Sequence, residues 1–281
     1  MALIRLLDEP DTDIYSRIRD KIFCYGLDAI PLLEGAWESS FDGLIQERIE
    51  GIIHTIQLDN LYAELGIWAQ QGGNDLLKGY ILISKFQYPD LNAENIMRHI
   101  GRISQDVWLE LNQNLTALEK VKVMNHILYD ICGFTGNKLN INAPENYYLN
   151  VMLESKKGNP ISLGALYIII AQSLGMPVYG VDLPRHFVLA YLEGNLRENS
   201  LEEDRKVIFY INPFNKGALF TRNEIELYIK QMTLKDQVRY YVGCRNKVII
   251  RRMMEELANQ YKNSGNPEKA LELTRLLMAL D

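Results

Sequence analysis

The stretch that decides the fold is Lys157–Tyr191, which reads KGNPISLGALYIIIAQSLGMPVYGVDLPRHFVLAY. Within it, Ile161–Leu174 is almost entirely apolar or small, which predicts a helix that is buried on nearly all sides. Asn159 can cap the start of this helix, and Pro160 fits its first turn because the N–H that proline lacks has no partner there. The Gly-Met-Pro sequence at 175–177 ends the helix. We therefore predict a helix at the centre of a folded domain.

Residues that favour strands follow this helix. The segment Val178–Tyr191 is rich in β-branched and aromatic side chains on both sides of Pro184, which indicates two strands. Another such run, Val207–Ile211, comes after the polar stretch Gly194–Lys206, which we expect to be an exposed connection between two antiparallel strands. A central helix followed by strands is similar to the order of parts in papain-like and transglutaminase-like hydrolase cores.

Four motifs carry a more specific resemblance. They read GNPISLxxLY from Gly158, SLGMP from Ser173, LPxHF from Leu183 and NPFNxG from Asn212. Together they resemble the transglutaminase-like domain of the SirB-type bacterial regulators, and the resemblance runs from about residue 91 to the C-terminus. It implies an α+β, mostly helical fold, in which a papain/transglutaminase-like core of a central helix and an antiparallel sheet is followed by tetratricopeptide-like helices.

The resemblance also assigns a candidate catalytic site. Active transglutaminase-like enzymes have a Cys at the start of the helix, a His on one strand and an Asp on another. Aligning the Leu-Gly-Met-Pro turn places these positions at Pro160, His186 and Asn212. Asn can replace Asp in such triads, but proline cannot act as the nucleophile that a helix-terminal thiolate provides. The resemblance therefore implies a protein- or peptide-binding regulatory module without catalysis. The alternative is a protease-like hydrolase that uses Ser162 with His186 and Asn212.

Further residues are expected beside this site. The predicted groove residues are Asn159, Pro160, Arg185, Asn146 and Tyr147. Asn146 and Tyr147 belong to an asparagine-rich loop, and such loops are usually self-bonded turns. Arg185 can be either a solvated charge or an anion contact, and the sequence leaves both open. Taken alone, His186 would more often be a structural histidine than a catalyst.

The rest of the chain reads as helices on both sides of this core. We predict an N-terminal helical region at 1–88 with HEAT-like helix pairs, the transglutaminase-like core at 89–235 and a tetratricopeptide-like helix pair at 236–281. Within the first region, separate helices are expected at Leu44–Ile56 and Leu58–Gln70. The N-terminal helices could form a separate domain or a cap packed on the core.

Composition excludes several classes of protein. A net charge of −6 without a Lys/Arg block argues against a nucleic-acid surface. Apolar runs stay below 18 residues and the first 20 residues lack a signal-peptide pattern, so we expect neither a membrane helix nor export. Cys24, Cys132 and Cys244 lack metal-ligand spacing, which indicates reduced thiols in a cytoplasmic protein. The sequence predicts neither a metal nor a cofactor.

Overall fold

The computed structural model describes residues 3–194 and 206–281. The chain divides into two compact units, Met1–Ile67 and Trp68–Asp281. Both boundaries that the sequence predicts, near residues 88 and 235, fall inside the second unit. Most of the predicted connection Gly194–Lys206 lies outside the described residues.

The first unit is helical. It contains α1 (Thr12–Phe23), α2 (Ile30–Ser39) and most of α3 (Gly43–Gln70). Its small core is formed by apolar side chains from all three helices and from the segment before them: Leu7, Ile18, Ile22, Leu33, Ile49, Ile52 and Ile56. The sequence prediction of two helices over 44–70 is wrong, because α3 is continuous. The residue between the two predicted helices, Gln57, is a good helix former, and no Gly or Pro interrupts the chain there.

The second unit is built around α8 (Pro160–Ser173), the helix that the sequence places at the centre. All residues from Ile161 to Ala171 are buried. Asn159 caps the helix and Pro160 occupies its first position, as predicted. An all-round apolar helix of this kind must be covered on every side, and the surrounding elements provide that cover.

A four-stranded antiparallel sheet packs beside α8. It consists of β3 (Val178–Leu183), β4 (His186–Leu192), β5 (Val207–Asn212) and β6 (Ala218–Phe220), in that order across the sheet. The two-residue turn Pro184-Arg185 joins β3 to β4, so Leu183 pairs with His186. Strands β4 and β5 pair antiparallel, which confirms the predicted relation between them.

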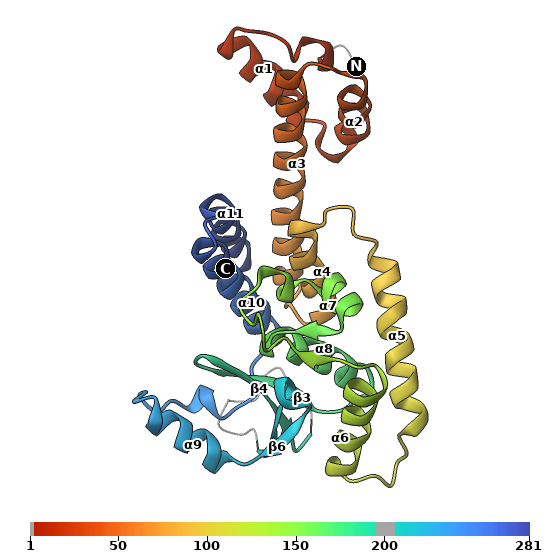
Figure 1. The fold of residues 1–281 in the computed structure, drawn as a ribbon, viewed down its shortest axis with the longest axis vertical. Helices are drawn as coiled ribbons and strands as arrows, with labels where there is room; N and C mark the ends of the chain where they lie inside the picture. The colour runs from red at the N-terminus through yellow and green to blue at the C-terminus, as the bar shows by residue number, and fades with distance from the viewer. Residues whose placement is uncertain (1–2, 195–205) are drawn as a thin grey trace. The chain divides into compact units, whose positions relative to one another are not determined.

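The two faces of the sheet have different neighbours (Figure 1). Phe187 of β4 faces α8, because a Cβ atom on Gly164 of α8 would lie 2.6 Å from its ring. Val188, the next residue, packs in a cluster with Ile225 and Ile229 of α9 (Arg222–Gln231). Since successive strand residues point to opposite faces, α8 and α9 cover opposite sides of the sheet.

Helices surround this core. They are α4 (Leu76–Gln87), α5 (Ala93–Glu110), α6 (Ala117–Asn125) with a π-helical turn at His126–Ile131, and α7 (Leu149–Ser155). A two-stranded parallel pair, β1 (Thr135–Gly136) and β2 (Lys157–Gly158), lies before α8. The C-terminal pair is α10 (Asn246–Asn263) and α11 (Pro267–Leu277), and α10 contacts α4, α8 and β3. The mostly helical α+β fold predicted from the sequence is confirmed.

Candidate functional site

Ser162, the alternative nucleophile, is a capping residue at the start of α8. Its Oγ accepts a hydrogen bond from the Asn159 backbone N–H at 2.9 Å and donates to the Asn159 carbonyl oxygen at 3.1 Å. The Ser162 N–H in turn donates to Asn159 Oδ1 at 2.9 Å. The exposed fraction of Ser162 is 0%, and a Cβ atom on Gly158 would lie 2.6 Å from the Ser162 Oγ. The hydroxyl is therefore enclosed, and its single proton is already donated.

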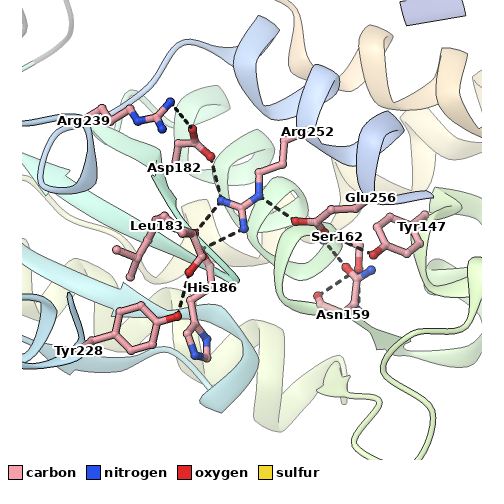
Figure 2. A network of polar contacts seen from close by, with 11 residues as sticks. Tyr147, Asn159, Ser162, Asp182, Leu183, His186, Tyr228, Arg239, Arg252 and Glu256 are labelled. Carbon is pink, nitrogen blue, oxygen red and sulfur yellow. Dashed lines mark hydrogen bonds and ion pairs between the residues drawn. The ribbon is translucent and has the colours of Figure 1, made fainter. Parts of the chain in front are cut away.

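His186 and Pro160 belong to opposite sides of the sheet. His186 begins β4 and is exposed, and its ring lies 4.8 Å from the ring of Tyr228 on α9 in an edge-on contact. The side chains of His186 and Val188 point to the same face of β4, so His186 lies on the α9 side of the sheet. Pro160 and Ser162 belong to α8, which lies on the other side. Figure 2 shows the His186 ring turned toward Tyr228. Partial desolvation and the charge of Arg252 lower the His186 pKa, which favours the neutral ring.

Asn212 ends β5 and caps the turn that follows. Its Oδ1 accepts hydrogen bonds from the backbone N–H groups of Phe214 and Asn215, both at 3.1 Å. Among the described residues, no hydrogen bond joins Asn212 to the His186 ring. The Asn212 side chain thus closes a turn in the structure.

The rest of the NPFNxG motif is fastened to the helices before the sheet. Asn125 Nδ2 donates to the Gly217 carbonyl oxygen at 2.9 Å, and the Tyr167 hydroxyl donates to Asn125 Oδ1 at 3.1 Å. The Tyr129 hydroxyl donates to the Pro213 carbonyl oxygen at 3.0 Å. These bonds come from buried or half-buried side chains, so the motif serves as an internal fastening.

Asn146 and Tyr147, predicted to line the groove, are both buried. Asn146 donates to the carbonyl oxygens of Asn140 and Ile141 at 2.7 and 3.1 Å, which makes its loop self-bonded. Tyr147 donates its hydroxyl to Glu256 on α10 at 3.3 Å. Neither side chain is directed at His186 by any of these bonds.

Arg252, which no sequence pattern singles out, lies at the centre of a polar network near these residues (Figure 2). Its Nε donates to Glu256 Oε1 at 2.8 Å and its Nη1 to Asp182 Oδ1 at 2.9 Å. It also donates to the carbonyl oxygens of Leu183 at 2.9 Å and His186 at 3.2 Å. The exposed fraction of its side chain is only 12%. The Arg252/Glu256 spacing of four residues on a helix was the available signal, but it is also typical of surface pairs.

The network pins the turn that carries Arg185. Arg252 holds the carbonyl oxygens on both sides of the turn, and the Tyr228 hydroxyl donates to the Pro184 carbonyl oxygen at 2.8 Å. Arg239 adds a weaker ion pair with Asp182 at 4.0 Å. The arrangement positions the exposed surface around Arg185 and His186 rather than a nucleophile.

The described part of the chain contains no group of His, Cys, Asp and Glu side chains that could hold a metal ion. Across residues 3–194 and 206–281, no helix is long and apolar enough to cross a membrane.

Comparisons with known proteins agree with this fold. Residues 94–255 match the family model described as the transglutaminase-like superfamily. The chain is 32% identical to the human F-box only protein 21 over 142 residues, which are 50% of this chain and 22% of that protein. It is 25% identical to a UPF0162 protein of Xylella fastidiosa over 220 residues, covering 73% and 71% of the two chains. It is 24% identical to Protein SirB1 of Salmonella typhimurium over 206 residues, or 72% of each chain.

The F-box relatives are much longer than the matched region, since the alignments span 22–25% of their length. No solved structure matches the chain significantly.

Proposed function

The chain belongs to the transglutaminase-like superfamily, and from this premise we propose that it is a non-catalytic member that acts as a protein- or peptide-binding regulatory module. The observation that carries the proposal is the state of Ser162, the alternative nucleophile nearest the helix start. Its hydroxyl is enclosed and bonded to the backbone of Asn159 on both its donor and acceptor sides. A nucleophile must instead be accessible and hydrogen-bonded to a base.

Three further features support the proposal. Pro160 is the first residue of α8, and the resemblance aligns it with the thiol of the family's enzymes; proline has no group that could attack a carbonyl. His186 lies on the side of the sheet covered by α9, so it is not placed to take a proton from α8. The three cysteines, Cys24, Cys132 and Cys244, all lie outside α8.

The choice of partner follows from charge. A net charge of −6 disfavours a nucleic-acid surface, and we infer that the partner is a protein or peptide. The three free thiols fit a reducing, cytoplasmic location.

A fluorophosphonate probe, which labels activated serines, tests the proposal. We expect Ser162 to remain unlabelled in the native protein. We also expect Ser162→Ala to lower the free energy of unfolding by about 1 kcal/mol, because it removes a capping bond. Ser155→Ala is the control for stability, because Ser155 is the exposed last residue of α7 and its hydroxyl makes only longer bonds, of 3.3 and 3.4 Å, with the Lys157 backbone. Labelling of Ser162 that disappears in His186→Ala would refute the proposal.

A further inference from the structure

The turn between β3 and β4 holds a non-glycine residue in a left-handed conformation. Arg185 has φ of 61°, and Pro184 precedes it, which is the arrangement of a type II turn. Glycine is favoured at this position because a Cβ atom makes the left-handed conformation about 1–2 kcal/mol less favourable. An arginine here is therefore retained against a local conformational cost.

The surroundings hold this turn rigidly. Three carbonyl oxygens in and beside the turn accept hydrogen bonds from side chains: those of Leu183 and His186 from Arg252, and that of Pro184 from Tyr228. Strained backbone persists where the surrounding structure fixes it, and such sites cluster where proteins bind ligands. The turn thus presents Arg185 at a fixed point.

The Arg185 side chain is exposed to solvent. Within residues 3–194 and 206–281, no carboxylate lies at ion-pair distance from it. The nearby acids Asp182 and Glu256 are both bonded to Arg252. A cationic point on a chain with a net charge of −6 is suited to an anionic partner group.

Two other groups gather around this charge. The His186 ring lies against the ring of Tyr228. Burial raises the pKa of the Tyr228 hydroxyl, and the charges of Arg185 and Arg252 oppose that rise. His186 is exposed and its pKa is lowered, so near pH 7 its ring is a neutral hydrogen-bonding group. Arg185 and His186 therefore offer a charged fork and a polar ring on one surface, beside the apolar edge of Tyr228.

We propose that Arg185 and His186 bind a carboxylate side chain of an acidic peptide segment in the partner protein. This inference rests on the proposed function and names the chemistry of its partner. One guanidinium matches one carboxylate in a two-bond fork. A phosphate dianion would call for a second uncompensated cation, and the charge of Arg252 is already balanced by Asp182 and Glu256.

The test is a nuclear magnetic resonance titration of the full chain with an N-acetylated, C-amidated tetraglutamate peptide at constant ionic strength. We expect a saturable shift of the His186 ring resonances. Arg185→Gly should weaken the binding by about tenfold or more, because it removes both hydrogen bonds of the fork to the carboxylate. The same variant should melt at a higher temperature than the native chain, because glycine relieves the left-handed strain. Lost binding together with gained stability cannot come from misfolding.

Lys216→Gly is the matched control. Lys216 is also an exposed cation with positive φ, at 49°, so this change alters net charge and backbone strain in the same way. It should leave peptide binding unchanged. Absence of saturable binding, or equal affinity in native and Arg185→Gly chains, would overturn the proposal. Inorganic phosphate that binds more tightly than the peptide, with the same dependence on Arg185, would overturn the assignment to a carboxylate.

The two proposals fail separately. Labelling of Ser162 by the fluorophosphonate would remove the non-catalytic role without affecting the titration. Peptide binding that persists in Arg185→Gly would leave a peptide-binding module and remove only this site.

Discussion

Replacing Arg252 with methionine tests whether the buried polar network holds the β3–β4 turn. The substitution keeps most of the side-chain volume but removes the charge and all four hydrogen bonds, to Asp182, Glu256, Leu183 and His186. Two carboxylates and two carbonyl oxygens then lose the donor that Arg252 provides. Asp182 would keep only its 4.0 Å ion pair with Arg239, and Glu256 only the hydrogen bond from the Tyr147 hydroxyl.

The expected loss follows from burial. Breaking a buried ion pair by removing one partner costs about 3–5 kcal/mol. The exposed fractions of the Asp182 and Glu256 side chains are 29% and 33%, so water can partly replace the lost contacts. We therefore expect the free energy of unfolding to fall by about 3 kcal/mol, at the lower end of that range.

Urea unfolding at pH 7 measures this loss. Trp68 reports on the second unit, because its buried ring lies beside Ile250 of α10 at the site of Gly79. Arg251→Met is the matched control. Arg251 is the neighbouring residue, and it pairs with Asp281, whose side chain is 73% exposed. A surface pair of this kind contributes at most about 1 kcal/mol.

The hydrogen-exchange rates of β3 and β4 provide a second measurement. Loss of the Arg252 hydrogen bonds to the turn should speed amide exchange at the turn end of the β3–β4 hairpin in Arg252→Met. Exchange there should be unchanged in Arg251→Met. If the two variants lose the same small stability, the network is not what fixes the turn, and the reasoning is refuted.

Two other predictions concern Gly217 and His99. Gly217→Ala should lower the free energy of unfolding by about 3 kcal/mol, because φ is 70° and the new Cβ would clash with Asn125 Oδ1. Urea unfolding measures this loss, and a loss below about 1 kcal/mol would contradict the predicted clash. Desolvation and the charges of Lys156 and Arg102 lower the His99 pKa. The neutral His99 ring therefore stabilises the folded state fully above pH 6.5, and this contribution to the free energy of unfolding is lost as the pH falls below that value. Lys156→Met should raise this pKa in a histidine titration, and no change would show that Lys156 has no influence.

The family motifs act as structural elements in this chain. The Asn-Pro pair at 159–160 caps a helix, the Leu-Pro-Arg-His turn is clamped by Arg252, and NPFNxG is fastened by Asn125 and Tyr129. In each motif, side chains form hydrogen bonds with backbone groups of the motif. This accounts for the presence of the motifs without requiring a catalytic role.

Much of the central architecture follows from the sequence alone. The near-total apolarity of Ile161–Ala171 requires burial, and Asn159-Pro160 fixes where that helix begins, because capping and proline geometry act over a few residues. The presence of proline, and not cysteine, at position 160 is likewise read directly from the sequence. These conclusions depend only on local chemistry, and the structure agrees with the predicted helix and its start.

Only the tertiary structure decides which side of the sheet each side chain faces and which distant residues it contacts. The alternation of side chains along a strand predicts that His186 and Phe187 point to opposite faces of the sheet. Only the packing of Phe187 against Gly164 shows which of these faces is covered by α8. Arg252 meets Asp182 across 70 residues of sequence, and neither has a local pattern that predicts the other. Local sequence sets conformation, whereas contacts between distant segments are fixed by how the whole unit excludes water from its core.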